Sequence, residues 1–381
     1  MAHPRWIWQH PSWPRLTFDA SRLAGLLAIA REESGRLLGK AESIGMAERA
    51  TIEREVWARE AVATAAIEGE NLDLNTVRSS VARRLGLRHE GPATPRDAEG
   101  LLDVMENATQ AWKKPLSAKQ LCTWHAYLFP AGTMLRPMRV GAYRRDVMQI
   151  VSGPIGRENV HYEAVPAAAL KEEMRAFLDW FNASRGDATD GLVRAGLSHI
   201  WFESIHPFDD GNGRIGRAIV DLALAQDARR STRMHGVAAA MREHQSDYYS
   251  ALNHAQRGDG DVTDWLSWFL QIYTQSCRDS TVLIDEALAR ARFWFDRRDV
   301  QVNAEQRKAL NRMLDAGPGR FEGGLTARKY QSITGTTKLT ASRHLADLVA
   351  KGFIVRAEGA GGRSTRYDLA IPGWAWVPGL Q

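Results

Sequence analysis

Apolar residues recur every three to four positions along most of the first 290 residues, which is the spacing of amphipathic helices. The segment that follows Asp19 has this pattern, and Asp19 is itself a suitable N-cap. The stretch 46–70 continues the pattern and ends near Gly69. Further predicted helices cover about 97–112, 117–128, 166–183, 189–205, 213–227 and 261–290. The sequence therefore predicts a mainly α-helical chain.

Two segments break the helical pattern. Residues 139–166 have β-branched flanks around Ser-Gly-Pro-Ile-Gly, which is typical of a β-hairpin. Residues 300–372 have the order helix, helix, helix, strand, strand, which predicts a winged helix-turn-helix. Its recognition helix is expected at 336–350 and its wing tip at 359–364. The expected domains are an N-terminal helical extension (1–94), a central helical domain (95–290) and the winged helix (300–372).

The composition excludes several classes of protein. Hydrophobic residues make up 44% and charged residues 25% of the 381 positions, as in an ordinary globular protein. No apolar run is long enough to span a bilayer, and the prolines near the start do not fit a secretion signal. The two cysteines, Cys122 and Cys277, lie far apart and predict no structural zinc. We therefore expect a cytoplasmic protein with no membrane partner.

Positive charge is concentrated at the C-terminal end. From residue 300 onward twelve Lys and Arg residues face six Asp and Glu, in a chain of net charge +5. The predicted recognition helix offers Lys338, Arg343 and His344, and Arg363 and Arg366 lie near the predicted wing. Such residues suit the phosphates of DNA. Winged helices also serve as protein–protein or dimerisation modules, and the sequence leaves both interpretations open.

The candidate chemistry lies in His-Pro-Phe-Asp-Asp-Gly-Asn-Gly-Arg-Ile-Gly-Arg, residues 206–217. Pro207 should end the preceding helix at about His206, and a new helix should begin at Asn212 or Gly213. The loop between them leads into a helix N-terminus, where unpaired N–H groups favour anions. The loop positions that allow a tight turn are Gly211, Asn212 and Gly213.

The charged side chains of this stretch suit a metal-bound polyphosphate. Arg214 and Arg217 lie three apart on one face of the new helix, and each guanidinium can bind phosphate oxygens in pairs. Asp210 would repel a phosphate unless a cation such as Mg²⁺ lay between them. His206 titrates near neutral pH and could remove a proton from an attacking hydroxyl. Phe208 is expected to anchor the loop in the core.

Two other interpretations of this stretch are open at this point. His199, Glu203 and His206 have helical spacing, which could give a two-histidine, one-carboxylate metal site. That site would leave the Gly-Asn-Gly-Arg half unexplained. The stretch could also be a polar helix–loop–helix with surface arginines. A Walker P-loop and the kinase signatures are absent.

Residues 206–217 resemble the full Fic-domain signature, His-x-Phe-x-Asp/Glu-Gly-Asn-Gly-Arg-x-x-Arg, at every fixed position. This resemblance favours the polyphosphate interpretation over both alternatives. It covers about 95–285 as a helical Fic core, and the hairpin at 139–166 resembles the family's target-docking flap. The N-terminal extension and the winged-helix tail resemble those of a subset of bacterial Fic proteins.

The resemblance implies a nucleotidyltransferase that moves AMP from ATP to a Tyr, Ser or Thr hydroxyl of a protein target or of itself. Mg²⁺ and ATP are then required, homodimerisation is expected, and removal of AMP by the same site is an additional activity of the family. The implied base is His206, and the implied Mg²⁺ ligand is Asp210. The implied nucleotide contacts are the anion hole Gly211, Asn212 and Gly213, then Arg214 at the β-phosphate and Arg217 at the γ-phosphate.

Residues 247–256 resemble the family stretch that borders adenine. The resemblance implies that Tyr248, Tyr249 and Gln256 contact the nucleotide. Ordinary core packing is an equal alternative for these three side chains. The alternative function for the whole chain is a DNA-binding transcriptional regulator in which the Fic domain acts as a nucleotide sensor.

Thr64, Glu68 and Gly69 resemble the family's inhibitory motif, Ser/Thr-x-x-x-Glu-Gly/Asn. A glutamate near a helix C-terminus is unfavourable with the helix dipole, so Glu68 should have a cationic partner. The expected partner is Arg217, and their ion pair would occupy the guanidinium that should hold the γ-phosphate. A solvated glutamate at the end of a helix is the alternative.

Overall fold

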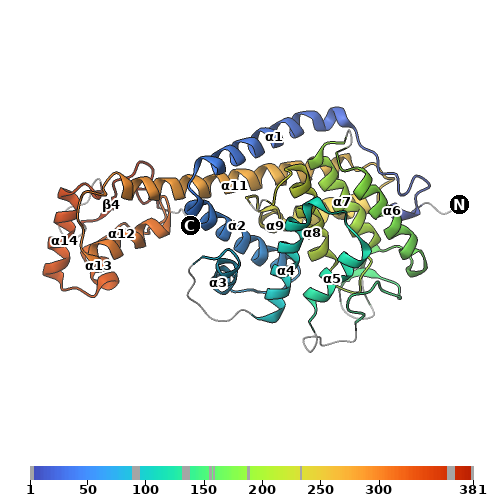
Figure 1. Cartoon of the computed structure of the whole chain (residues 1–381), viewed down its shortest axis with the longest axis horizontal. Coiled ribbons are helices and arrows are strands. Elements are labelled where there is room, and N and C mark those ends of the chain that lie inside the picture. The colour runs from blue at the N-terminus through green and yellow to red at the C-terminus, as the bar shows by residue number, and fades with distance from the viewer. Residues whose placement is uncertain are drawn as a thin grey trace. The chain divides into compact units, whose positions relative to one another are not determined.

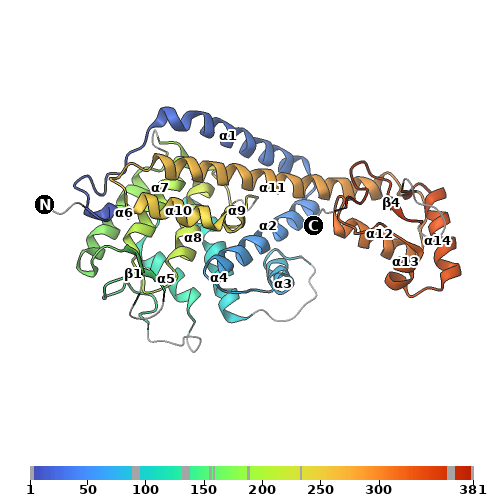
Figure 2. The same cartoon turned by 180° about the vertical axis from the view of Figure 1, so that it is seen from behind.

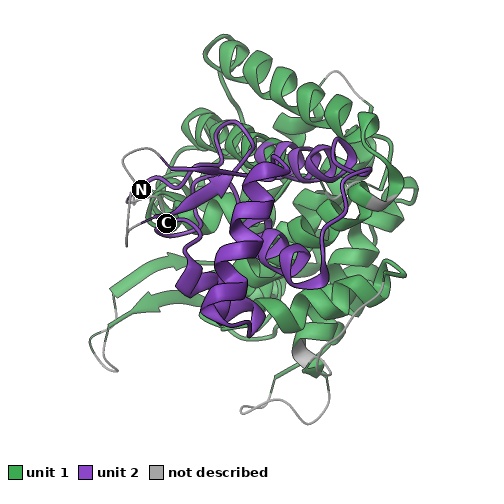
Figure 3. Ribbon diagram, turned by 90° about the vertical axis from the view of Figure 1, so that its left-hand side faces the viewer, with its two compact units in different colours: residues 1–281 green, residues 282–381 purple. Residues whose placement is uncertain are grey.

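Helices make up most of the computed structural model (Figure 1), and this confirms the mainly α-helical fold class. The structure describes residues 4–87, 95–130, 138–153, 157, 159–186, 189–231, 234–357 and 365–378. Two compact units can be distinguished, residues 1–281 and residues 282–381, and each is described by itself (Figure 3).

The first unit is built from helices and one β-hairpin. The helices are α1 (Ala20–Ser43), α2 (Met46–Ile67), α3 (Leu74–Arg84), α4 (Arg96–Gln110), α5 (Ala118–Leu128), α6 (Leu170–Ala183), α7 (Gly191–Ile205), α8 (Asn212–Asp227), α9 (Val237–Glu243), α10 (Gln245–Gln256) and the start of α11 (Thr263–Phe295). The strands are β1 (Gln149–Ser152) and β2 (Asn159–Glu163). The sequence pattern did not predict α3, α9 or α10.

Local signals set the ends of the helices that matter for the site. The Asp19 side chain accepts hydrogen bonds from the backbone N–H groups of Ser21 and Arg22, so the predicted N-cap of α1 is confirmed. Helix α2 ends at Ile67 with Glu68 as its C-cap. Gly69 follows with φ of 81°, a left-handed conformation that glycine adopts without a steric penalty.

Helices α7 and α8 form the centre of the first unit, and other helices surround them in both views (Figures 1 and 2). Every residue of α7 from Leu192 to Ile205 is buried. Gly196 allows α11 to approach closely, because a Cβ there would lie 2.8 Å from a methyl carbon of Leu266. The Trp265 indole donates a hydrogen bond of 2.8 Å to the Gly196 carbonyl across this contact. This packing gives the site that follows α7 a rigid base.

The predicted β-hairpin is present as the antiparallel pair β1–β2, with Gln149 opposite Glu163 and a register shift after Ile150. Most of its predicted turn, residues 154–156 and 158, lies outside the described residues. Tyr162 is fully buried, and its hydroxyl donates a hydrogen bond of 2.7 Å to the Ser204 carbonyl in α7. The hairpin is therefore tied to the helix that leads into the site.

The second unit contains α12 (Ala304–Ala316), α13 (Ala327–Thr334), α14 (Lys338–Ala350) and the antiparallel strands β3 (Ile354–Arg356) and β4 (Tyr367–Leu369). Its core includes Leu310, Tyr330, Leu345, Phe353 and Leu369. The order of elements follows the sequence pattern, and the winged-helix assignment stays a prediction. The predicted wing tip, 359–364 with Arg363, lies outside the described residues. None of the described helices is long and apolar enough to cross a membrane.

Candidate active site

The loop between α7 and α8 has a tightly defined backbone. His206 follows the last residue of α7 and has φ of 50° and ψ of 63°, a left-handed conformation that is rare for residues other than glycine. Gly211, with φ of 76°, is the N-cap of α8. The predicted helix boundaries at His206 and Asn212 are confirmed. A strained conformation of this kind persists only where the surroundings fix it, and strain of this type clusters at functional sites.

Asn212 and Phe208 hold the loop in shape. The Asn212 side chain accepts a hydrogen bond from the Phe208 N–H and donates one to the Phe208 carbonyl, each 2.9 Å long. Phe208 is fully buried and stacks on His125 with ring centroids 4.4 Å apart. The predicted anchoring role of Phe208 is confirmed. The side chain of Asn212 thus serves the shape of the loop, and what remains at the helix start for an anion is backbone N–H.

Arg144 is a second support of the loop, which the sequence analysis missed. Its buried guanidinium donates to the carbonyls of His206 and Asp146 at 2.8 Å each, and to Ile205 and Val165. Its backbone N–H also donates to the Pro207 carbonyl. No pattern in the sequence distinguishes Arg144 from its neighbour Arg145, because only the fold brings these carbonyls together.

A carboxylate lies behind the candidate base. Nδ1 of His206 is 3.5 Å from Oε2 of Glu203, one turn earlier on α7. Burial alone would raise the pKa of Glu203, but His206, His199 and Arg217 lower it further, so this carboxyl group is ionised at neutral pH. A carboxylate at Nδ1 favours the tautomer with its proton on that nitrogen, which leaves Nε2 as the basic one.

The predicted alternative of a metal site at His199, Glu203 and His206 is not supported. Within the described ranges no group of three metal-binding side chains is assembled. His199 stacks on Trp265, and its Nε2 lies 3.0 Å from the Tyr248 hydroxyl. Its side chain therefore belongs to the core.

Arg217 is buried and is held by the end of α2. It donates to the Thr64 side-chain oxygen, to the Thr64 carbonyl at 3.0 Å and to Oε1 of Glu68 at 2.7 Å. Burial alone would lower the pKa of Arg217, but the negative charge of Glu68 contributes to a net increase. The ion pair expected between Glu68 and Arg217 is therefore present. Gly213 makes room for it, because a Cβ there would lie 2.1 Å from the Glu68 oxygen.

The second site arginine is paired as well. Arg214 donates to Oε1 of Glu70 at 2.7 Å and lies over the ring of Phe129, with its guanidinium carbon 5.0 Å from the ring centre. The sequence analysis did not assign Glu70. The available signal was the spacing Glu-Gly-Glu, because the left-handed turn at Gly69 separates the two carboxylates at the end of α2.

Two buried donors of these arginines lack a hydrogen-bond partner among the described residues. They are Nε of Arg214 and Nη1 of Arg217. Leaving such groups unpaired is costly, and phosphate oxygens would satisfy them well. The donors and the start of α8 therefore fit a polyphosphate.

Asp210 lies at the tip of the loop with 62% of its side chain exposed, and its Oδ1 is 3.8 Å from Arg214. Magnesium keeps several of its waters and commonly takes only one or two carboxylates beside phosphate oxygens. An exposed carboxylate next to the start of α8 fits that donor set. Asp210 is the residue that would hold Mg²⁺, and the ion would neutralise phosphate charge.

The three residues expected at adenine do not form one surface. Tyr248 and Gln256 are buried, and Gln256 donates to the Glu203 carbonyl at 3.2 Å. Tyr249 is 41% exposed, and its hydroxyl donates to the Ile67 carbonyl at 3.0 Å. The geometry favours core packing for Tyr248 and Gln256, and only Tyr249 lies where a base could reach it.

Glu60 fastens the same helix further from the site. Glu60, Thr64 and Glu68 are each four apart, so they lie on one face of α2. The buried Glu60 carboxyl group accepts hydrogen bonds from the N–H groups of Ala238 and Ala239, at 2.6 and 3.0 Å. This contact ties α2 to the start of α9.

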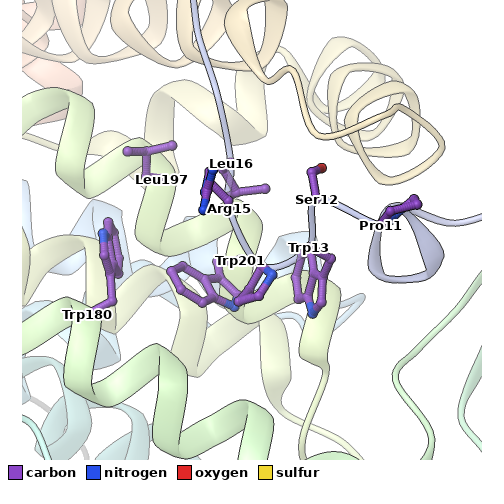
Figure 4. A pocket seen from close by; sticks show the side chains of 9 residues that line it. Pro11, Ser12, Trp13, Arg15, Leu16, Trp180, Leu197 and Trp201 are labelled. Carbon is purple, nitrogen blue, oxygen red and sulfur yellow. The ribbon is translucent and has the colours of Figure 1, made fainter.

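A cavity of about 560 Å³ lies apart from these residues, between the N-terminal segment and helices α6 and α7 (Figure 4). Its walls include Trp13, Trp180 and Trp201, and Trp13 donates a hydrogen bond of 2.9 Å to Glu173. No histidine, cysteine or carboxylate lines this cavity in the described part of the chain. The aromatic contacts hold the N-terminal segment on the first unit, and the candidate active site is the α7–α8 loop.

Comparison with known families matches both parts of the first unit. Residues 115–224 match the Fic/DOC family, and residues 6–87 match a domain of unknown function, DUF4172. The second family therefore contains the inhibitory stretch and the first contains the α7–α8 loop.

Curated relatives carry the name protein adenylyltransferase Fic. One from Nematostella vectensis is 25% identical over 199 residues, 51% of this chain and 42% of its own length. One from Drosophila willistoni is 25% identical over 250 residues, 64% and 44% of the two chains. A probable protein adenylyltransferase of Aquifex aeolicus is 33% identical over 103 residues, 27% and 29% of the two chains. The chain thus spans less than half the length of these relatives.

Solved structures share the fold. A Fic family protein from Desulfovibrio desulfuricans has a TM-score of 0.53 at 23% identity and covers 93% of this chain and 98% of its own. A Fic-domain signalling protein from Bacteroides thetaiotaomicron has a TM-score of 0.52 at 18% identity and covers 67% and 96% of the two chains. Together with the complete motif at 206–217, these matches identify residues 115–224 as a Fic domain of the Fic/DOC family.

Proposed function

We propose that this chain is a protein adenylyltransferase, which transfers AMP from ATP to a Tyr, Ser or Thr hydroxyl of a target protein or of itself. The observation that carries the proposal is one arrangement. A histidine with a carboxylate behind it ends α7, and α8 begins six residues later with two buried arginines on its first turns.

The proposed reaction is one in-line displacement. Nε2 of His206 takes the proton of the acceptor hydroxyl as the oxygen attacks the α-phosphorus. The bond from that phosphorus to the bridging oxygen breaks, and pyrophosphate leaves with the electron pair. The N–H groups at the start of α8 and Arg214 hold the leaving phosphates, and Arg217 holds the γ-phosphate. Bound Mg²⁺ supplies neutralisation of the phosphate charge at Asp210.

The β1–β2 hairpin is the proposed docking flap. Its strands are short and largely exposed on both faces. A strand at the edge of a two-stranded sheet can accept an extended peptide through backbone hydrogen bonds. Such docking would select a target by its extended backbone near the acceptor hydroxyl. Removal of AMP by the same site, homodimerisation and a cytoplasmic location stay predictions.

The proposed regulation is competition for the arginines. Glu68 occupies Arg217, so ATP would bind with its γ-phosphate out of place and the α-phosphorus away from His206. Support comes from the burial of Arg217 and from its three contacts with α2. A buried ion pair of this kind can contribute a few kcal/mol, which shifts a two-state population by about one to two orders of magnitude.

The test is incubation of the Glu68→Gly protein with ATP labelled at the α-phosphate, with Mg²⁺, followed by gel autoradiography and mass spectrometry. We expect labelled protein with Glu68→Gly, less with wild type and none with Glu68→Gly/His206→Ala. A label at the γ-phosphate should not be transferred. Transfer of the γ label, or equal α labelling with and without His206, would overturn the proposal.

A further inference from the structure

The second unit contains a basic helix face that the proposed transferase reaction does not use. Helix α14 packs on its own core through Ala341, Leu345 and Leu348. The opposite face of its first half presents Lys338, Leu339, Ser342 and Arg343, and all four side chains are exposed. Leu339 has 76% of its surface exposed.

The geometry before this face is that of a helix-turn-helix. Helix α13 ends at Thr334 and α14 begins at Lys338, so the turn has three residues. Gly335 lies first in the turn with φ of 74°, and its N–H donates to the Gln331 carbonyl at 2.7 Å. The Thr337 side chain caps α14 by accepting from the Thr340 N–H. These contacts fix α14 against α13 and leave its first turns free of packing.

The charge of the region has one sign. From residue 323 to residue 346 the sequence has no Asp or Glu but has four Lys and Arg residues. The exposed cations Arg328, Lys338 and Arg343 form no ion pair with a described residue. The acid at the far end of α14, Asp347, is bound by Lys351 and Gln306 at 2.6 and 2.8 Å. Net positive charge at this face is therefore not cancelled locally.

One sequence expectation is corrected here. His344 was expected to offer its side chain to DNA, but its ring faces its own unit. Nδ1 lies 2.9 Å from the Tyr330 hydroxyl and Nε2 lies 3.2 Å from the Asn303 side chain. Lys338 and Arg343 remain available, and Leu339 between them was not assigned from the sequence.

We infer that the first half of α14 is a recognition surface for duplex DNA. A major groove admits one α-helix, and the N-terminal residues of a recognition helix contact the base edges. Arg343 can bind a guanine in a bidentate manner, and Leu339 can contact a thymine methyl group. Arg328 and Lys338 neutralise backbone phosphates, and the antiparallel pair β3–β4 follows α14 as the base of a wing. A protein partner would more commonly require an apolar patch larger than one leucine.

The test is fluorescence anisotropy of the full chain with a labelled duplex of mixed sequence, without nucleotide, over a range of salt concentrations. We expect saturable binding at about 50 mM salt that weakens by roughly 10-fold or more at about 200 mM. The variant Lys338→Glu/Arg343→Glu should lose at least about 10-fold in affinity and lower the salt slope by about 2.

The matched control is Lys308→Glu/Arg312→Glu, which changes the net charge equally on exposed positions of α12. It should bind within about 3-fold of wild type, and circular dichroism should show equal melting of all three proteins. Double-stranded RNA should compete at least about 10-fold less well than DNA, because its major groove is too narrow for a helix. Absent binding at low salt, or equal losses in the two variants, would overturn the inference. A change of oligomeric state in the α14 variant without DNA binding would overturn it in favour of a protein interface.

Discussion

Arg217 donates a 2.7 Å hydrogen bond to Glu68, and it also binds Thr64 one turn earlier on the same helix. The cation that the Fic motif supplies for a phosphate is therefore held by residues more than 140 positions away. One of its donors, Nη1, stays buried without a described partner. The same residue is thus positioned for phosphate and engaged by α2.

We expect Glu68→Gln to raise the affinity for ATP with Mg²⁺ by about 10- to 100-fold, because the amide cannot form the ion pair with the buried guanidinium. Isothermal titration calorimetry measures this directly and does not depend on catalysis. The control is Glu53→Gln on the same helix, whose partner Arg49 lies 3.3 Å away. Equal affinities of wild type and Glu68→Gln would show that the pair does not compete with nucleotide.

Glu70→Gln should have a smaller effect of about 2- to 5-fold on ATP affinity. Its ion pair with Arg214 is 2.7 Å long, but 42% of the glutamate side chain is exposed, so solvent screens the interaction. The double variant with Glu68→Gln should bind ATP more tightly than either single variant, because each glutamate holds a different arginine. A double variant that only equals Glu68→Gln would mean that Glu70 takes no part in the inhibition.

Glu203→Gln should lower kcat by about 10- to 100-fold in the Glu68→Gly background with little change in ATP affinity. The carboxylate lies 3.5 Å from Nδ1 of His206 and touches no proposed substrate position, so it acts as a positioning residue. Nitrogen NMR of the histidine ring should show a loss of the single tautomer in the variant. An unchanged tautomer and kcat with a lowered melting temperature would indicate a structural role alone.

Arg144→Met should lower stability by about 3 kcal/mol or more and abolish transfer. The change removes a buried guanidinium that donates to four backbone carbonyls, including that of His206, and leaves those carbonyls unpaired. Chemical denaturation measures the loss. The neighbouring variant Arg145→Met removes an exposed arginine and should stay within about 0.5 kcal/mol of wild type.

Acid should weaken the fold through His125. Burial lowers the pKa of His125 to about 4, and its Nδ1 accepts a hydrogen bond of 2.9 Å from the Gly141 N–H. The unfolded chain protonates this ring near its ordinary pKa of 6.5, so between these values the unfolded state binds more protons. The stability contributed by neutral His125 is full above about pH 6.5 and is lost as the pH falls toward 4.

The measurement compares denaturation midpoints of wild type and His125→Asn between pH 7 and pH 5. Asparagine keeps an acceptor near the position of Nδ1 but does not titrate. The variant should lose less stability over this range, by on the order of 1 kcal/mol per pH unit. Buried His199 and His235 titrate in both proteins and cancel in the comparison. Parallel pH profiles would exclude His125 as the cause.

The sequence by itself determined the features that depend on neighbouring residues. Pro207 ends α7, Gly211 allows the left-handed turn into α8, and Asp19 caps α1, because backbone sterics and local hydrogen bonds act over a few residues. The complete motif at 206–217 determined the family and the chemistry of the loop for the same reason, since all its donors lie within twelve residues.

Tertiary structure alone decided which distant groups meet. Arg144 beneath the loop, Glu70 on Arg214 and Glu60 at the start of α9 each join segments far apart in sequence, and no local pattern ranks these residues above their neighbours. Tyr248 and His344 had side chains suited to a ligand, and packing against their own cores engaged them instead. A side chain's partner depends on which surfaces the fold buries together, and that is set by the summed packing of all the helices.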